Sequence, residues 1–220
     1  MLVAGIDEAG RGCVIGPLVI AGILIKQENL PALKQLGVKD SKLLTAKKRE
    51  KLLPQILDLT EKHVIIKVSP AEIDHVVENG KKLYRLNRLE ADNMAKIVNM
   101  LQPDEAQVDA VDVLEERFKR HIEENLTVTT NIISKHKADI NFPAVSAASI
   151  IAKVNRDHEI AMLAAEYGDF GTGYLTDGRS MIFLKKWLES NDDYPDFVRR
   201  SWKPAKRIKA EKCAVQQTLV

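Results

Sequence analysis

Short apolar runs alternate with longer amphipathic segments along most of the chain. Five of the runs are rich in aliphatic and β-branched residues, are bounded by turn-forming or polar residues, and have the length of strands. They predict strands within residues 2–7, 17–25, 63–69, 105–112 and 127–134. Only residues 8–16 separate the first two strands, so an antiparallel pair is expected there.

Other segments carry apolar residues at helical spacing. They predict helices over residues 45–57, 83–101, 113–126 and 143–167. Thr45 suits the N-cap of the first helix, and Pro54 predicts a kink or break within it. An initial hairpin followed by strands separated by helices indicates an α/β fold, in which helices cover a mixed sheet.

Aspartates follow three of the predicted strands. Asp7 ends the first strand, Asp109 closes the fourth, and Asp139 comes after the fifth. In such sheets, ligands and reacting groups gather beyond the strand ends. A lone aspartate after a strand is usually a turn former or a helix cap. Three that converge on one edge of a sheet indicate a functional site.

Asp7 and Glu8 are adjacent, which a capping role does not explain, because a cap needs only one acid. Carboxylates that are buried together raise one another's pKa and are costly to bury without a cation. Mg²⁺ and Mn²⁺ prefer oxygen ligands and offset that cost. Such ions suit phosphodiester hydrolysis, in which one ion activates water and another stabilises the leaving oxygen.

The sequence GRGCVIG (10–16) begins one residue after these acids. It is not a dinucleotide-binding fingerprint, because it has one residue too many before its last glycine and leads into a strand rather than a helix. It is not a phosphate-binding P-loop either, because no Gly-Lys-Ser/Thr follows. Two interpretations stay open: a tight hairpin connection, or a backbone that a ligand can approach closely.

The overall composition is that of an ordinary globular protein. The 220 residues are 45% hydrophobic and carry a net charge of +2, so total charge favours no class of partner. The stretch from Arg199 to Lys212 is strongly basic, with Glu211 as its one acid. This stretch fits either a solvated segment or a surface that contacts a polyanion.

The cysteines and the apolar stretches place the protein in the cytoplasm. Cys13 and Cys213 lie at opposite ends of the chain and form no metal-binding motif, which fits a reducing compartment. No apolar stretch is long enough to span a bilayer, and the first strand lacks the flanks of a signal peptide. We expect no membrane partner.

Several separated blocks, in order, resemble archaeal ribonuclease HII. They are GIDEAGRGCVIGP (5–17), VKDSK (38–42), VDAVD (108–112), SKHKAD (134–139), FPAVSAASIIAKVNRD (142–157) and GDFGTGYLTD (168–177). The resemblance extends from Met1 to about Lys206. It implies a ribonuclease H-like catalytic domain over 1–178, with a mixed five-stranded sheet flanked by helices. It also implies a small helical C-terminal region with a basic segment over 179–220.

The resemblance implies an endonuclease that uses Mg²⁺ or Mn²⁺ by a two-metal mechanism. Such an enzyme hydrolyses RNA in RNA–DNA hybrids and cuts on the 5′ side of ribonucleotides embedded in duplex DNA, during replication and repair. The family's four metal-binding acids correspond here to Asp7, Glu8, Asp109 and Asp139. They are therefore the expected catalytic residues.

Substrate-binding residues are likewise implied by the resemblance. The segment that senses the ribose 2′-hydroxyl corresponds to Gly10, Arg11 and Gly12, and the tyrosine that stacks on the following sugar corresponds to Tyr174. A phosphate-contacting block corresponds to Lys39, Ser41 and Lys42. Further expectations concern Lys153 and Arg156 as phosphate contacts, His136 as a mobile site residue or a surface histidine, and Asp112 as a helix cap.

The expected partners are RNA–DNA hybrids and ribonucleotide-containing duplex DNA, bound by a monomer. Archaeal members often end in a sliding-clamp motif with paired aromatic residues, and the final QQTLV has no aromatic residue, which argues against clamp binding. Two other functions stay open. Another nuclease or recombinase of this fold would not cut at a lone ribonucleotide, and a non-catalytic hybrid-binding module would bind without metal-dependent cleavage.

Overall fold

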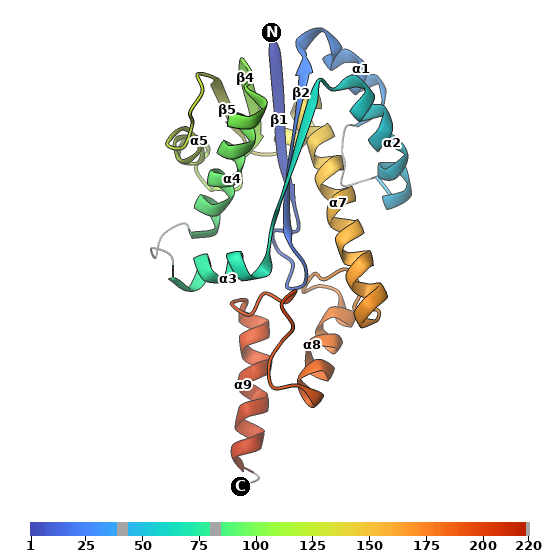
Figure 1. Cartoon of the computed structure of the whole chain (residues 1–220), viewed down its shortest axis with the longest axis vertical. Coiled ribbons are helices and arrows are strands. Elements are labelled where there is room, and N and C mark those ends of the chain that lie inside the picture. The colour runs from blue at the N-terminus through green and yellow to red at the C-terminus, as the bar shows by residue number, and fades with distance from the viewer. Residues whose placement is uncertain (39–43, 80–84, 219–220) are drawn as a thin grey trace.

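A mixed five-stranded sheet forms the centre of the protein (Figure 1). The computed structural model describes residues 1–38, 44–79 and 85–218. In the spatial order β3-β2-β1-β4-β5, the strands are Lys62–Val68 (β3), Leu18–Lys26 (β2), Leu2–Ala9 (β1), Glu105–Asp109 (β4) and Asn131–Lys135 (β5). β2 is antiparallel to both neighbours, whereas β1, β4 and β5 are parallel. The carboxyl ends of β1, β4 and β5 therefore share one edge.

Helices cover both faces of the sheet, with α4 and α5 on one side and α2 and α7 on the other (Figure 1). The helices are Leu30–Gln35 (α1), Ala46–Leu59 (α2), Pro70–Asn79 (α3), Arg85–Leu101 (α4), Glu115–Glu123 (α5), Ala138–Asn141 (α6), Pro143–Tyr167 (α7), Gly178–Ser190 (α8) and Lys203–Thr218 (α9). A short 3₁₀ turn, Gln27–Asn29, precedes α1. Within the described residues, no helix has the length and apolar character needed to cross a membrane.

The packing of α7 onto β1 depends on Gly5. A Cβ atom at this position would lie 2.1 Å from the backbone carbon of Ala144 and 2.4 Å from the nitrogen of Val145. Those atoms are backbone and cannot turn aside, so only glycine lets α7 lie this close to the strand. The close contact brings the polar side chains of α7 to the strand end that carries Asp7.

The fifth strand and α2 differ from the prediction in their bounds, whereas β4 ends at Asp109 as predicted. β5 begins at Asn131, four residues later than predicted, and Thr127 N donates to Asn99 Oδ1 of α4 at 2.8 Å. Pro54 lies inside α2 without ending it, and buried Leu52 and Ile56 anchor the helix on both sides of the proline. The prediction of a break there was wrong, although the strand and helix types were confirmed.

Three helices were not predicted: α1, α3 and α6. The start of α3 is a capping box, in which Ser69 Oγ accepts a hydrogen bond from Glu72 N at 3.2 Å and Glu72 accepts one from Ser69 N at 2.8 Å. The S-x-x-E pattern is readable in the sequence and could have identified this helix. The α1 helix has six residues, too few for its apolar spacing to be distinctive.

The C-terminal region packs onto the glycine loop that follows β1. A hydrophobic cluster joins Leu184, Leu188 and Val198 of this region to Val14 and Ile15 of the loop. Ile15 also forms a backbone bridge with Val198. The division of the chain at residue 178 remains a prediction, but the contacts make the loop part of the C-terminal core.

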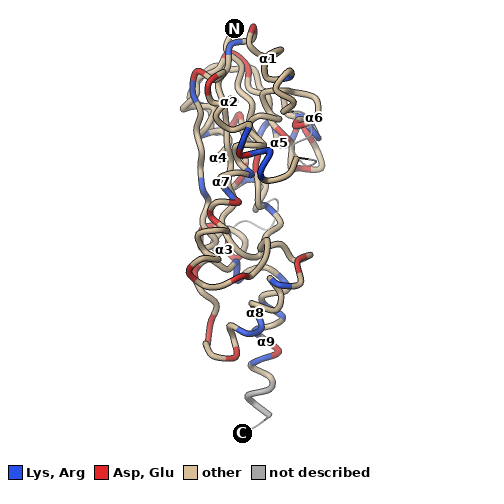
Figure 2. The backbone as a smooth tube through the Cα atoms, turned by 90° about the vertical axis from the view of Figure 1, so that its right-hand side faces the viewer, with Lys and Arg blue, Asp and Glu red and all other residues tan. Residues whose placement is uncertain are grey.

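The basic stretch from Arg199 to Lys212 is largely paired within the protein. Lys206 lies 2.9 Å from Glu78 and Lys209 lies 2.7 Å from Asp193, in a region where basic and acidic residues are interleaved (Figure 2). Arg199 is fully buried, which contradicts the prediction that the whole stretch faces solvent or a polyanion.

Candidate active site

Asp7 and Asp109 close two neighbouring parallel strands. Ile6 of β1 lies opposite Val108 of β4, so the next residue on each strand places these two carboxylates together. Burial raises the pKa of Asp7 to about 7, against a lowering effect of the Lys153 ammonium and with a further raising effect of the Asp109 charge. The two acids thus interact at the edge where the sequence predicted a site.

Asp139 joins them from the next strand. It follows β5 and lies in the short helix α6, with its side chain buried. Asp109 Oδ1 accepts a hydrogen bond from Ala138 N at 2.7 Å, and the Ser146 hydroxyl donates to the Asp139 carbonyl oxygen. These contacts fix α6 between β4 and α7, and so bring the Asp139 residue beside Asp109.

Glu8 lies on the opposite face of β1 from Asp7, because side chains alternate along a strand. Burial raises the pKa of Glu8 to about 8, and the charges of Asp7 and Glu90 add to the effect. Asp7 instead accepts a hydrogen bond from Ser149 on α7. The two adjacent acids therefore lie on either side of the strand end.

The chemistry of these acids suits a divalent cation, but their arrangement does not provide a complete set of metal ligands. Carboxylate oxygens are the ligands that Mg²⁺ and Mn²⁺ prefer, and buried acids with raised pKa values gain from a nearby cation. Across the described ranges 1–38, 44–79 and 85–218, however, no group of three or more His, Cys, Asp or Glu side chains is arranged to hold a metal ion. Asp7 and Asp109 are the pair that fits, and Glu8 and Asp139 lie on its two sides.

The metal-free protein should lose stability between about pH 4 and pH 8. The folded-state pKa values of Asp7, Glu8 and Glu90 are about 7, 8 and 7, above ordinary values of 3.8, 4.5 and 4.5. Over that range the folded protein holds protons that the unfolded chain has released, so the free energy of unfolding falls as pH rises. Melting curves in a chelator at pH 5 to 8.5 test this, and the Asp7→Asn variant should show a shallower decline. Equal declines in the two proteins would contradict it.

The glycine loop, residues 10–16, leaves open space beside the acids. Gly10 and Gly16 both have φ near +90°, a conformation that only glycine adopts without strain. Gly12 is exposed, and a Cβ atom built there meets no atom within 4 Å. Gly10 and Gly16 thus serve the turn itself, whereas Gly12 is open to a ligand.

Arg11 points away from this open space. Its Nε donates to both carboxylate oxygens of Glu90 on α4, at 2.9 and 3.1 Å, and its Nη2 donates to Asn87 Oδ1 at 2.7 Å. Glu90 is fully buried and was not predicted as a site residue. The Arg11 side chain therefore anchors the loop to α4, although it stays 36% exposed.

Tyr174 lies against the same loop. It forms a backbone bridge with Cys13, and Val14 N donates to the neighbouring Gly173 carbonyl oxygen at 2.9 Å. The Arg156 guanidinium lies 4.8 Å from the centre of the Tyr174 ring. Tyr174 is 37% exposed, so one part of its ring remains open to solvent.

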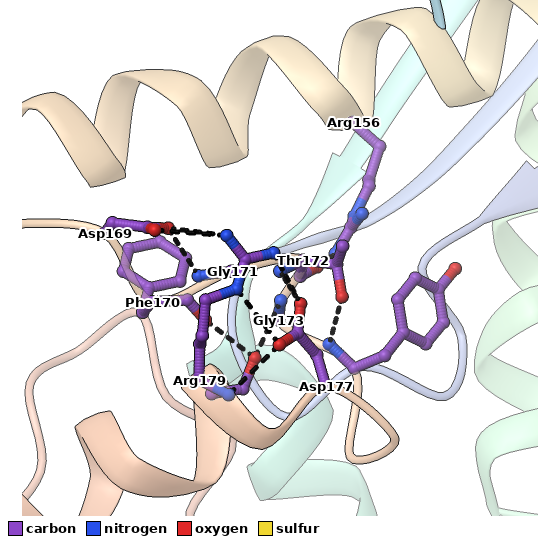
Figure 3. A network of polar contacts seen from close by, with 10 residues as sticks. Arg156, Asp169, Phe170, Gly171, Thr172, Gly173, Asp177 and Arg179 are labelled. Carbon is purple, nitrogen blue, oxygen red and sulfur yellow. Dashed lines mark hydrogen bonds and ion pairs between the residues drawn. The ribbon is translucent and has the colours of Figure 1, made fainter. Parts of the chain in front are cut away.

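Arg156 is a structural contact and not the phosphate contact that was predicted. It is buried on α7, where its Nη2 donates to Cys13 Sγ at 3.1 Å and to the Thr172 carbonyl oxygen. Beyond Thr172, Asp177 accepts from Thr172 N at 2.9 Å and pairs with Arg179 at 3.0 Å (Figure 3). This network fixes the loop that carries Tyr174.

The remaining predicted residues have less defined roles. Lys39, Ser41 and Lys42 lie outside the described residues. The His136 ring lies 3.2 Å from the Ala110 carbonyl oxygen and 3.3 Å from the Val113 carbonyl oxygen, close to the end of β4. Asp112 is not the helix cap that was expected, because the N-cap of α5 is Leu114; Asp112 instead accepts a hydrogen bond from Leu114 N at 3.0 Å and pairs with Arg117.

Comparisons with known proteins agree on one family. The family model described as Ribonuclease HII matches residues 4–205. Ribonuclease HII of Thermococcus kodakarensis is 46% identical over 214 residues, covering 96% of this chain and 91% of the relative. The crystal structure of the ribonuclease H2 from Pyrococcus horikoshii superposes with a TM-score of 0.88 at 43% identity, covering 96% of this chain and 98% of that one.

A second solved structure is that of the PCNA:RNase HII complex from Archaeoglobus fulgidus. It has a TM-score of 0.83 at 42% identity and covers 92% of this chain and 96% of that one. The central sheet, its helices and the C-terminal helix are therefore those of ribonuclease H2 structures. On sequence and structure together, this chain belongs to the ribonuclease HII family and is a ribonuclease H enzyme.

Proposed function

We propose that the enzyme uses divalent metal ions to cut the strand on the 5′ side of a ribonucleotide, in RNA–DNA hybrids and at ribonucleotides embedded in duplex DNA. The observation that carries the proposal is the pairing of Asp7 and Asp109 at the ends of neighbouring strands, with Asp139 beside Asp109, Glu8 on the other face of β1, and an open glycine loop after β1. The acids suit the hydrolysis, and the loop suits recognition of the sugar.

In the proposed mechanism, the acids bind the metal ions, and neighbouring groups orient the acids. Asp7 and Asp109 would hold Mg²⁺ or Mn²⁺, and Glu8 and Asp139 would complete the site from either side. The ions would supply activation of water and stabilisation of the leaving oxygen. Ser149 holds Asp7 by a hydrogen bond, and Ala138 N holds Asp109, so both acids are oriented before the substrate arrives.

Recognition of RNA rests on the 2′-hydroxyl group, which alone distinguishes the sugars. The N–H groups of Arg11 and Gly12 form no hydrogen bond to any residue that the structure describes. They are therefore the backbone donors available to a ribose oxygen at the exposed end of the loop.

One assay tests the proposal. A DNA duplex with a single ribonucleotide is incubated with the enzyme and Mg²⁺ or Mn²⁺, with an all-deoxy duplex and a chelator as controls. We expect one cut on the 5′ side of the ribonucleotide, with 3′-hydroxyl and 5′-phosphate ends. Cleavage of hybrids without cleavage at the lone ribonucleotide would favour another nuclease of this fold, and binding without cleavage would favour a non-catalytic module.

Substitution of Tyr174 by alanine should weaken cutting at a lone ribonucleotide by about 10- to 100-fold. The exposed ring is available to lie on the sugar that follows the ribonucleotide, and stacking contacts of this kind contribute about 1–3 kcal/mol. A deoxyribose allows close contact, so the loss should be smaller on a continuous RNA–DNA hybrid. Initial rates on the two substrates measure the difference.

Tyr174→Phe is the matched control, because it keeps the ring and removes only the hydroxyl group that faces Cys13. It should cut both substrates at close to the parent rate. If Tyr174→Ala lowers the cleavage rate by the same factor on both substrates, the ring packs against the loop and does not recognise the RNA–DNA junction.

A monomeric state and a cytoplasmic location complete the proposal. The location rests on the cysteine positions and the apolar pattern of the chain. The Archaeoglobus relative was solved in a complex with PCNA. A pull-down with the sliding clamp of the same organism would test whether this chain binds a clamp.

A further inference from the structure

A side chain from the far end of the sequence holds the glycine loop. The guanidinium of Arg199 donates from Nη2 to the Gly10 carbonyl oxygen at 2.7 Å, from Nη1 to that of Arg11 at 2.8 Å, and from Nε to that of Gly16 at 3.2 Å. All of its nitrogens therefore serve this one loop. The Arg199 backbone N–H also donates to the Val14 carbonyl oxygen, at 2.8 Å.

Arg199 is unusual as a structural residue. It is fully buried, and no carboxylate among the described residues forms an ion pair with it. Burial lowers its pKa to about 10, so it stays charged at neutral pH. A buried charge without an acid is costly unless its donors are satisfied. Here three carbonyl oxygens and the nearby Trp202 ring satisfy it, which explains how the charge is tolerated.

The contacts determine where the loop's own donors point. A trans peptide is planar, so its C=O and N–H groups point in opposite directions, and none of the described peptides is cis. Arg199 draws the carbonyl groups of Gly10 and Arg11 toward itself. The N–H groups of Arg11 and Gly12 must then point away from Arg199, toward the exposed side on which Gly12 lies.

The loop is held from a second side as well. The Arg11 side chain is anchored to Glu90 and Asn87 of α4. With the carbonyl groups held by Arg199 and the side chain held by α4, the peptides around Arg11 have little freedom to turn.

We propose that Arg199 is a positioning residue for ribonucleotide specificity, which it exerts by orienting the N–H groups of Arg11 and Gly12. The proposal rests on the proposed function, in which these groups meet the 2′-hydroxyl. It assigns to the C-terminal region a role in selectivity, whereas a basic surface would supply affinity for any duplex.

The test compares Arg199→Met with Lys206→Met. Lys206 belongs to the same basic stretch, but it is exposed and pairs with Glu78. We measure kcat/KM on a duplex with one ribonucleotide in Mg²⁺, and affinity for an all-deoxy duplex at several salt concentrations. Arg199→Met should lower kcat/KM by about 10- to 100-fold, the range for losing an oriented donor, and change deoxy-duplex affinity less than twofold. Lys206→Met should leave kcat/KM near the parent value.

Arg199→Lys serves as the second variant if Arg199→Met does not fold. It keeps the charge but cannot reach three carbonyl groups with one ammonium, so it should recover the melting temperature and only part of the kcat/KM. Hydrogen exchange of the Gly12 amide gives a readout without activity: its exchange should be slowed by the ribonucleotide duplex in the parent, and not in the Arg199 variants.

The outcomes separate the two proposals. If the parent enzyme does not distinguish the ribonucleotide duplex from the deoxy duplex, the proposed function fails. If the parent does so, and folded Arg199 variants keep the parental ratio of kcat/KM to deoxy-duplex affinity, the positioning role is overturned. Equal losses in Arg199→Met and Lys206→Met would also overturn it.

Discussion

Replacing Asp7 with asparagine is expected to abolish metal-dependent cleavage while leaving a folded protein. Asp7 interacts with Asp109 and with Ser149 and Lys153 of α7, within the proposed metal site. In the proposed mechanism, removal of its charge takes away a ligand to the ions, which would contribute several kcal/mol to the transition state. That loss corresponds to a rate lower by about 10³-fold or more.

The same substitution should separate metal binding from folding. An ion that binds the folded protein more tightly than the unfolded chain raises the melting temperature. The parent should therefore gain stability in millimolar Mg²⁺ or Mn²⁺, and Asp7→Asn should gain much less. Without metal, the variant should melt at or above the parent temperature at pH 8, because a buried carboxylate has been removed.

Asp192→Asn is the control, since Asp192 is fully exposed in the C-terminal region and, among the described residues, pairs only with Lys212, at 3.4 Å. It should keep the parental rate and the parental response to metal. Cleavage by Asp7→Asn at the parental rate would remove Asp7 from the active site. Loss of cleavage with an unchanged response to metal would show that Asp7 acts on the substrate and not on the ions.

The sheet edge could be predicted because it depends on local patterns. Each strand is a short apolar run, and Asp7, Asp109 and Asp139 are found by where those runs end. The parallel order of β1, β4 and β5 then brings the three ends together. Adjacent acids and neighbouring glycines are readable without any long-range information.

The side chains that support the site could not be predicted in the same way. Arg199 lies 189 residues from Gly10 along the chain, within a stretch whose charge is typical of a surface. Arg156 follows the half-buried Lys153 and precedes the half-buried Asp157 on α7, so its burial between Cys13 and Thr172 depends on tertiary contacts. Neither the composition nor the residue spacing predicts the contacts of Arg199 or Arg156.

The burial of Glu90 could have been predicted from the sequence. It stands four residues after Leu86 and four before Met94, on the apolar face of α4. An acid on such a face is buried with the face, and a buried acid needs a cationic partner. The partner is Arg11 of the glycine loop. The apolar pattern of α4 therefore indicates that Glu90 has a cationic partner, although it does not indicate which one.

Gly12→Ala should impair cleavage of every ribonucleotide-containing substrate without harm to the fold. A Cβ atom at Gly12 meets no atom within 4 Å, and its backbone does not have the positive φ of Gly10. The protein should therefore melt within a degree or two of the parent and respond normally to metal. The added methyl group would instead occupy the space through which the sugar approaches the N–H groups.

We expect kcat/KM to fall by about 100-fold or more, since a lost polar contact and a steric obstruction act together at one recognised group. The loss should be similar on a lone ribonucleotide and on a continuous hybrid, in contrast to Tyr174→Ala. Rates on both substrates and a melting curve measure this.

Gly178→Ala is the matched control, because a Cβ atom there also meets nothing within 4 Å and the residue is the first of α8. It should behave as the parent in all three measurements. Gly10→Ala should fail differently, since its Cβ would lie 2.8 Å from the Pro17 carbonyl oxygen at φ +90° and would destabilise the loop. A Gly12→Ala enzyme with parental rates would show that other groups recognise the sugar. Gly12 would then only be part of the turn.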